Sequence, residues 1–469
     1  MEKSRKKRVF VLLPDGIGLK NFAYSDFPKK GVQNGFEVVF WNKTSFNLTE
    51  LGFSEVKLPN LKPFFVSTIL KNVKTSIFLD YFTLKFKDDT YQSYKFTSYS
   101  TSKSVKDLFK NYLFRFFLLL FDNRFRNNIQ KLIQFLESNT TYYSSCKSQL
   151  AVEKPDFIFC TNQRHVSAIA PLLAAADLGI PTSTFIFSWD NLPKATLVLS
   201  TDYYFVWSSY MKNELLSYYP AIKGEQIKIV GTPQFEFYYN PLNIIPEEEF
   251  FFKYNMNKEW DYVCFSGDDI TTSPFDAFYL RDLAASIVKI NMVQEKKIGI
   301  IFRRCPVDFS DRYNQVLEEF KDIIVVIDPA WTSFGECWNE IMPTVEDIRI
   351  LTSTIYYSKM VFNLGSSMVF DFIIFGKPCF YFNYNPVLDF NQNWSVQKIY
   401  KFIHFKSMPS KKAVFWIDTK ESISPMLLEL INYEGKLDLT ETQIWFEKIV
   451  SVSPSTTSSV IWENITELV

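Results

Sequence analysis

Asn-Leu-Gly-Ser-Ser-Met-Val-Phe-Asp-Phe-Ile-Ile-Phe-Gly-Lys-Pro occupies positions Asn363 to Pro378, where an apolar strand is expected to end and a helix to begin. The turn Gly365-Ser366-Ser367 lies between them. The first N–H groups of a helix have no intrahelical partner, so such a turn is a natural seat for a phosphate or another anion. Gly376-Lys377-Pro378 ends the helix before a strand expected at 379–382. α/β proteins bind nucleotides at strand–helix–strand units of this kind.

Strand and helix patterns alternate on both sides of this stretch. The expected strands are 8–13, 36–41, 157–160, 184–187, 203–207 and 226–230 in the first half, and 262–265, 298–302, 323–327 and 359–364 in the second. The alternation predicts an α/β protein with two Rossmann-like domains facing a central cleft. We expect an N-terminal Rossmann-like domain at 1–233, a linker at 234–259 and a C-terminal Rossmann-like domain at 260–440. Helices expected in 441–469 could pack back on the N-terminal domain.

Two segments outside this alternation carry separate expectations. Residues 42–103 are poorly patterned and predict short strands and loops. Residues 107–135 predict one long helix, which is aromatic and basic over 107–131. A helix of that kind can make a peripheral contact with an anionic bilayer surface. The alternative is a helix packed on the sheet with a charged outer face.

Composition excludes several classes of protein. The 469 residues suggest two domains, and a formal net charge of zero gives no reason to expect a nucleic-acid partner. Six Cys without a Cys-x-x-Cys spacing, and only two His, argue against a structural zinc site or a disulfide framework. The apolar run after the basic N-terminus is too short for a signal peptide. We therefore expect a cytoplasmic protein, with peripheral attachment to the inner face of the membrane left open.

The two expected halves resemble glycosyltransferases of the GT-B type. The stretch 363–378 is similar to the nucleotide-site motif of CDP-glycerol glycerophosphotransferases and related surface-polysaccharide transferases. Ser366-Ser367, Phe370-Asp371 and Lys377-Pro378 match that motif, while Asn363-Leu364-Gly365 replaces its usual start. The resemblance covers much of the C-terminal half, and the N-terminal half only in layout. It implies a nucleotide held by the C-terminal domain and an acceptor in the N-terminal domain.

One departure from that family bears on the reaction. The phosphotransferases carry a histidine in an Arg-Pro-His-Pro turn, but the corresponding turn here is Arg303-Arg304-Cys305-Pro306. Their Trp-His-Gly motif has no counterpart either. The resemblance therefore favours sugar transfer over transfer of a polyol phosphate.

The donor-site candidates lie at expected strand ends of the second half. Gly365, Ser366 and Ser367 would donate to a diphosphate, and ordinary helix capping is the alternative. The remaining candidates are Ser266, Gly267, Arg303, Arg304 and Asp371. An arginine there could pair with diphosphate oxygens, or it could belong to a solvated surface pair. The turn at Ser266-Gly267 could approach a phosphate through its backbone, or it could be a plain surface turn.

Transfer to a hydroxyl needs a base, for which the first half offers three candidates. Asp15 and Asp190 follow expected strands, and His165 follows another and has the most suitable ordinary pKa for its residue type. Their alternatives are a turn residue, an Asx-turn and a polar helix start. No Asp-x-Asp motif lies where a metal would hold a diphosphate, so we expect metal-independent chemistry without a cofactor.

Together these observations predict a glycosyltransferase that moves a sugar from a nucleotide-sugar donor to a surface-glycan or lipid-linked acceptor. Two alternatives stay open. One is a CDP-alditol phosphotransferase of cell-surface polymer synthesis. The other is a catalytically silent GT-B-type protein that binds a nucleotide or acts as a scaffold.

Overall fold

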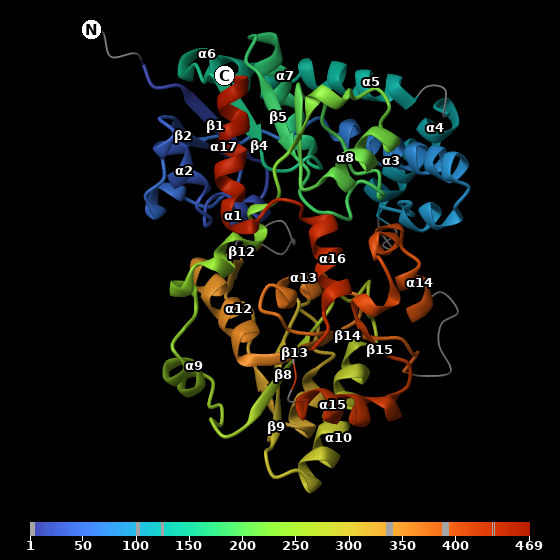
Figure 1. Cartoon of the computed structure of the whole chain (residues 1–469). Helices are drawn as coiled ribbons and strands as arrows, with labels where there is room; N and C mark the ends of the chain where they lie inside the picture. Colours follow the sequence, from blue (N-terminus) through green and yellow to red (C-terminus); the bar gives the residue numbers. More distant parts are fainter. Residues whose placement is uncertain are drawn as a thin grey trace. The chain divides into compact units, whose positions relative to one another are not determined.

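A computed structural model describes residues 5–99, 104–122, 126–333, 341–386, 394–433, 435 and 437–469. The chain divides into two compact units (Figure 1). The first unit contains Met1–Gln234 and Ile449–Val469, and the second contains Phe235–Lys448. Each unit is built on a parallel sheet, which confirms the expected α/β class with two parallel-sheet domains.

The first unit contains a seven-stranded sheet in the order β3-β2-β1-β4-β5-β6-β7. Every neighbouring pair is parallel, and β1 lies between β2 and β4. Chain order therefore reverses between β1 and β4, the position at which open parallel sheets leave room for a ligand. The strands are β1 (Arg8–Leu13), β2 (Glu37–Asn42), β3 (Glu55–Lys57), β4 (Phe157–Cys160), β5 (Thr182–Phe185), β6 (Tyr203–Val206) and β7 (Ile227–Ile229).

Helices cover both faces of this sheet, because nearly every residue of the central strands is apolar and buried. Side chains of β1 alternate between the faces, and Phe10 and Leu12 belong to the core beneath α3, α5, α6 and α7. The helices of the unit are α1 (Ile17–Phe22), α2 (Phe27–Gln33), α3 (Phe65–Phe86), α4 (Val105–Leu120), α5 (Arg126–Ser138), α6 (Thr141–Glu153), α7 (Ile169–Asp177), α8 (Ser209–Tyr218) and α17 (Thr457–Leu468).

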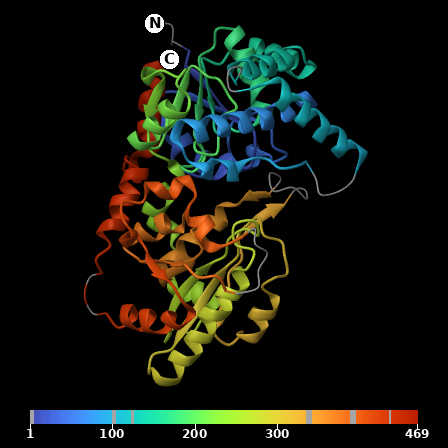
Figure 2. The ribbon, with the colours of Figure 1, turned by 90° about the vertical axis from the view of Figure 1, so that its right-hand side faces the viewer.

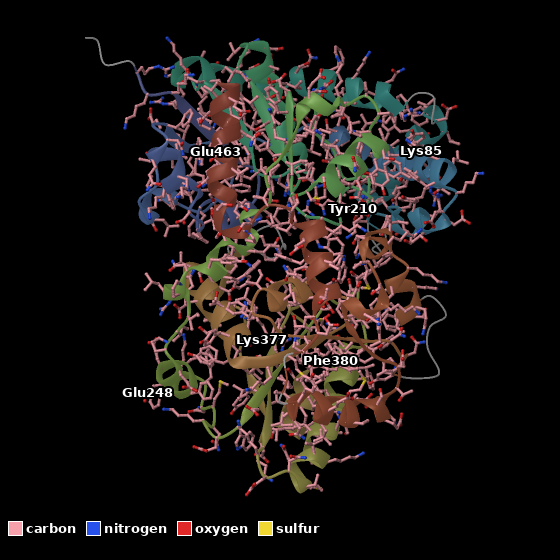
Figure 3. All side chains as sticks on the ribbon, in the orientation of Figure 1. Lys85, Tyr210, Glu248, Lys377, Phe380 and Glu463 are labelled. Atoms are coloured by element: carbon pink, nitrogen blue, oxygen red, sulfur yellow. The ribbon has the colours of Figure 1, made fainter. Side chains whose placement is uncertain are left out.

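The C-terminal helix α17 completes the first unit, so both chain ends belong to it (Figure 2). Trp462 is fully buried, stacks on Phe27 with ring centroids 4.9 Å apart and donates its indole N–H to the Phe27 carbonyl at 2.7 Å. Gly31 on α2 makes room for this ring. The neighbouring Glu463 is exposed and points outward (Figure 3).

The second unit contains a six-stranded parallel sheet in the order β10-β9-β8-β13-β14-β15. Chain order reverses here between β8 and β13. The strands are β8 (Asp261–Ser266), β9 (Ile298–Arg303), β10 (Ile324–Val326), β13 (Ser358–Asn363), β14 (Cys379–Phe382) and β15 (Phe415–Ile417). A separate antiparallel pair, β11 (Trp331–Ser333) and β12 (Ile341–Pro343), was not expected from the sequence.

The expected linker at 234–259 is instead a folded part of the second unit. Phe250 and Phe251 on α9 (Glu247–Lys253) are buried against Tyr262 of β8 and Tyr357. Its Pro and Glu residues start a helix whose other face is aromatic. The other helices of the unit are α10 (Asp276–Val293), α11 (Asn314–Glu319), α12 (Val345–Tyr357), α13 (Met368–Ile373), α14 (Val396–Tyr400), α15 (Ile423–Ile431) and α16 (Thr440–Ile449).

Two expectations for the first unit were wrong. Residues 65–86, expected as strands and loops, form the 22-residue helix α3, whose apolar residues Ile69, Val73 and Ile77 recur every four positions and are buried. The single helix expected at 107–135 is divided, because α4 ends at Leu120 and Phe121 is extended. None of the helices in the described ranges is long and apolar enough to cross a membrane.

Packing at Gly31 gives a first prediction. An added Cβ would lie 2.3 Å from Trp462 and 2.5 Å from Val38, so Gly31→Ala should destabilise the first unit by about 1–3 kcal/mol despite the better helix propensity of alanine. Gly224→Ala is the matched control, because an added Cβ there meets nothing within 4 Å. Urea unfolding of both variants measures the difference. Equal midpoints would contradict tight packing of α17 on α2.

Candidate functional site

The candidate site residues lie on loops that follow the strands at the two reversals of chain order. In the first unit, Asp15 follows β1 and His165 follows the adjacent strand β4. In the second unit, the loops after β8 and β13 are neighbours in the same way. Carboxyl ends of parallel strands meet at one edge of a sheet, so each unit gathers its polar loop residues at that edge.

Asp15 and His165 form a direct pair. His165 Nε2 lies 2.7 Å from Asp15 Oδ2, and Asn162 Nδ2 donates to the same oxygen at 2.8 Å. The Asp15 side chain is 1% exposed, whereas that of His165 is 20% exposed. The imidazole can therefore meet a substrate while the carboxylate behind it stays enclosed.

Electrostatics keep the Asp15 carboxylate ionised. Burial alone would raise its pKa, but the charge and hydrogen bond of His165, followed by the charge of Arg164, lower the pKa below the ordinary value of 3.8. A carboxylate accepting from Nε2–H leaves Nδ1 of the ring as the nitrogen that can take up a proton. Asp15 therefore orients the His165 ring.

Asp190, the third base candidate, lies on the next loop. Gln163 joins the loops, because its side chain donates to Asn191 Oδ1 at 2.9 Å and accepts from the Phe187 N–H at 2.9 Å. The Asp190 carboxylate forms an ion pair with Lys194. The structure thus brings Asp15 and His165 together and gives Asp190 a different charged partner.

In the second unit, the loops after β8 and β13 are bonded to each other. The Leu364 N–H donates to Asp268 Oδ2 at 3.1 Å. The Gly267 N–H donates to the Arg303 carbonyl at 2.8 Å, and an added Cβ at Gly267 would lie 2.9 Å from the Tyr313 hydroxyl. Ser266, the last residue of β8, is buried. The turn after β8 is therefore closely packed.

The half-buried Asp268 and the fully buried Asp276 are neighbours at this turn. Asp276 Oδ2 accepts from the Asp268 N–H at 3.0 Å and from the Tyr313 hydroxyl at 2.6 Å. Burial raises the pKa of both carboxyls, and the charge of Asp276 raises the pKa of Asp268 further, to well above the ordinary 3.8. Asp276 has the hydrogen-bond donors that suit a carboxylate, so the pKa of Asp268 is the one raised further.

The turn after β13, predicted to be an anion seat, is held by contacts within the second unit. Gly365 has φ +74°, and an added Cβ would lie 2.9 Å from Phe405. The Ser366 N–H donates to Asn363 Oδ1 at 2.9 Å, and the Ser366 carbonyl accepts from the Tyr381 hydroxyl at 2.8 Å. Ser367 occupies the N-cap of α13 without a side-chain capping bond, and the three turn residues are half-buried. The turn is rigid and still accessible to a ligand.

Arg303 and Asp371 have structural partners. Arg303 Nη2 donates to Asp347 Oδ1 at 2.7 Å, and both side chains are buried. Asp371 is 4% exposed and accepts from the Tyr238 hydroxyl at 2.5 Å. In this arrangement Arg303 joins β9 to α12 and Asp371 joins α13 to the segment 233–239, so neither charge faces an open surface.

Arg304 and Lys377 donate to backbone carbonyls of the second unit. Arg304 donates to the Ser310 carbonyl at 2.5 Å, and its guanidinium lies 5.2 Å from the Tyr313 ring centroid. Lys377 donates to carbonyls of Ile355, Tyr356 and Ser358 and so caps the C-terminus of α12 (labelled in Figure 3). This capping role explains why a lysine stands at the end of the stretch 363–378, and it requires no contact with a ligand.

Some residues of the site carried no signal in the sequence. Asn162, Asp276 and Tyr313 stand in ordinary helical or loop patterns, and only the fold brings them to the sheet edge. Within the described ranges, no group of three or more His, Cys, Asp or Glu could hold a metal ion.

Comparison with known proteins concerns the fold. The chain is similar to the UDP-GlcNAc 2-epimerase of Methanocaldococcus jannaschii, with 13% identity and a TM-score of 0.51 over 98% of this chain and 99% of that one. It is similar to a putative UDP-N-acetylglucosamine 2-epimerase from Listeria monocytogenes, with 10% identity and a TM-score of 0.50 over 99% and 97%. A search of protein-family models finds no match, and a search of curated proteins finds none either. The expected GT-B-type fold is confirmed, whereas the local resemblance to CDP-glycerol glycerophosphotransferases stays a prediction.

Asp268 and its chain neighbour Asp269 are predicted to affect stability with opposite dependence on pH. The raised pKa of Asp268 means that the folded state binds a proton which the unfolded chain releases above pH 3.8, so its burial costs stability as pH rises. Asp268→Asn should therefore raise Tm at pH 8 relative to wild type more than it does at pH 5.

Asp269→Asn is the matched control. Burial alone would raise the Asp269 pKa, but hydrogen bonds from Thr271 and Thr272 outweigh it and lower the pKa, so this carboxylate stabilises the fold above pH 3.8 and loses that effect as pH falls. Asp269→Asn should lower Tm at pH 8 and approach wild type near pH 4. Calorimetry measures the Tm of both variants across pH. Parallel curves of Tm against pH for the two variants would contradict the raised pKa of Asp268.

Proposed function

We propose that this protein transfers a sugar from a nucleotide-activated donor to a hydroxyl group of a surface-glycan or lipid-linked acceptor. The observation that carries the proposal is the pair of a partly exposed His165 and a buried, ionised Asp15. A histidine held in one orientation by a carboxylate is a general base suited to a hydroxyl proton at neutral pH.

In the proposed reaction, the acceptor oxygen forms a bond to the anomeric carbon of the donor. The bond from that carbon to the diphosphate oxygen breaks, and the nucleoside diphosphate leaves with the electron pair. The hydroxyl proton moves to Nδ1 of His165, and Asp15 stabilises the resulting imidazolium. This step needs no metal ion or cofactor, and the nucleotide-sugar is a co-substrate.

The turn Gly365–Ser367 is the proposed seat of the donor diphosphate. Its accessible backbone and the uncapped Ser367 hydroxyl can donate to phosphate oxygens. The raised pKa of Asp268 beside it favours the uncharged acid, which weakens the repulsion that an ionised carboxylate would cause. The two epimerases of similar fold act on UDP-GlcNAc by name, which supports a nucleotide-sugar ligand.

A second candidate is epimerisation of a nucleotide-sugar, favoured by those same neighbours. An oriented histidine could also accept a proton from a sugar carbon. The two functions separate in one experiment. Radiolabelled nucleotide-sugars are incubated with and without a glycan or lipid-linked acceptor, and the sugar is located. Transfer requires the acceptor, whereas epimerisation converts the donor alone. Transfer from CDP-glycerol but from no nucleotide-sugar would contradict the proposal.

The donor seat predicts a charge effect on binding. UDP, GDP, CMP and CDP are screened by thermal shift, and Ser367→Asp should abolish the shift given by the best ligand because it places a carboxylate against phosphate. An aspartate at an N-cap supports the helix itself, so folding should be retained. Ser422→Asp is the matched control, since Ser422 has the same cap conformation without a side-chain capping bond on α15. A full shift in Ser367→Asp would contradict this seat.

The base predicts a loss of turnover. His165→Gln should lower kcat by about 10²–10⁴-fold with nucleotide binding unchanged, because only the proton acceptor is lost. Asp15→Asn should also lower kcat, by about 10²-fold or more, since the amide cannot stabilise the imidazolium. His404→Gln is the control, as the other histidine of the chain lies in the second unit. Unchanged output from both site variants would favour the catalytically silent alternative.

A further inference from the structure

Helix α4 of the first unit carries an exposed apolar stripe along its whole length. Its exposed members run from Val105, 83% accessible, to Leu119, 88% accessible. The full set is Val105, Leu108, Phe109, Tyr112, Phe116, Leu119 and Leu120. At 100° per residue these seven side chains fall within an arc of about 120°, so they form one continuous face about 24 Å long.

The opposite face of α4 is fixed to the body of the unit. Phe114 is 6% exposed and packs edge-on against Phe96 and Tyr99, with ring centroids 5.5 and 6.3 Å apart. Asn111 Oδ1 accepts from the Tyr99 N–H at 3.1 Å. Figure 1 shows α4 at the outer edge of the unit beside α3. Packing of the inner face therefore keeps the seven exposed side chains, called the α4 stripe below, facing away from the body of the unit.

Cations border the α4 stripe on both sides. On the helical projection Arg115 follows one edge of the arc, and Lys106 and then Lys110 follow the other. Asp107 is the acidic residue of α4; it points to the inner side and bonds to Lys110 and to Ser104. An apolar face with aromatic and leucine side chains, bordered by basic residues, is the pattern of helices that lie in a membrane interface.

We propose that α4 binds the surface of an anionic lipid bilayer, with the α4 stripe at the headgroup–acyl boundary and its cations against lipid phosphates. The charges favour this occupant over a second copy of the chain. In a dimer joined through α4, each copy would contribute three cations and one acidic residue, so the two helices would repel each other. Anionic lipid, in contrast, neutralises the cations. The inference goes beyond the proposed function and does not depend on it.

Co-sedimentation with lipid vesicles tests the stripe. The full chain should bind vesicles of phosphatidylcholine with phosphatidylglycerol, and Phe116→Glu combined with Leu119→Glu should lower the partition coefficient at least about tenfold. Phe252→Glu is the matched control, because Phe252 on α9 is 87% exposed in an acidic segment. Its binding should equal wild type. Nucleotide thermal shifts should be the same in all three proteins, so a failure of donor binding is distinguishable from a failure here.

Charge reversal tests the lipid specificity. Lys106→Glu and Arg115→Glu should each lower partition onto the anionic vesicles by about fivefold and leave the weak partition onto pure phosphatidylcholine unchanged. Equal wild-type binding to both vesicle types would overturn the proposal. So would a wild-type dimer that the stripe variant converts to monomer while neither protein binds vesicles.

Discussion

Reversal of chain order within each parallel sheet is the constraint on which the rest of the structure depends. The chain adds β2 on one side of β1 and β4 on the other, and likewise β9 and β13 on the two sides of β8, so right-handed crossovers place helices on both faces of each sheet. At each reversal the loops that follow two adjacent strands turn toward opposite faces of the sheet. The polar side chains at the beginning of these loops therefore lie close together at the carboxyl ends of the strands. Asp15 therefore meets His165, which lies 150 positions later in the chain, only because β1 and β4 are neighbours.

Three carboxyl groups show how local partners decide the state of an acid. Asp15 is enclosed but ionised, because the imidazole of His165 and the side-chain amide of Asn162 both contact its Oδ2 atom at hydrogen-bond distance. Asp276 is enclosed and accepts from several donors, whereas the pKa of the adjacent Asp268 is raised further by the charge of Asp276. Desolvation raises the pKa of all three carboxyls, so the difference comes from hydrogen bonds and neighbouring charge.

The sequence predicted those parts of the structure that depend on local patterns. The strands at 8–13 and 379–382 match because short buried runs flanked by turn residues have few other solutions. Helix α3 was missed since its serines, threonines and aromatics are weak helix formers, and burial of Ile69, Val73 and Ile77 is what stabilises it. For the site, strand ends indicated Asp15 and His165. No local pattern indicates that Arg303 pairs with Asp347, since that contact is made by the tertiary fold.

The packing of α17 on α2 has a consequence for synthesis on the ribosome. The Trp462 indole bonds to Phe27, 435 positions earlier, so the first unit is completed only when the end of this sequence has emerged. At translation rates of about 5–20 residues per second, the surface of Phe27 and Gly31 waits roughly 20–90 s for its partner. The second unit lies wholly inside this interval and can fold first. During that time Phe27 on α2 lacks the ring that later stacks on it.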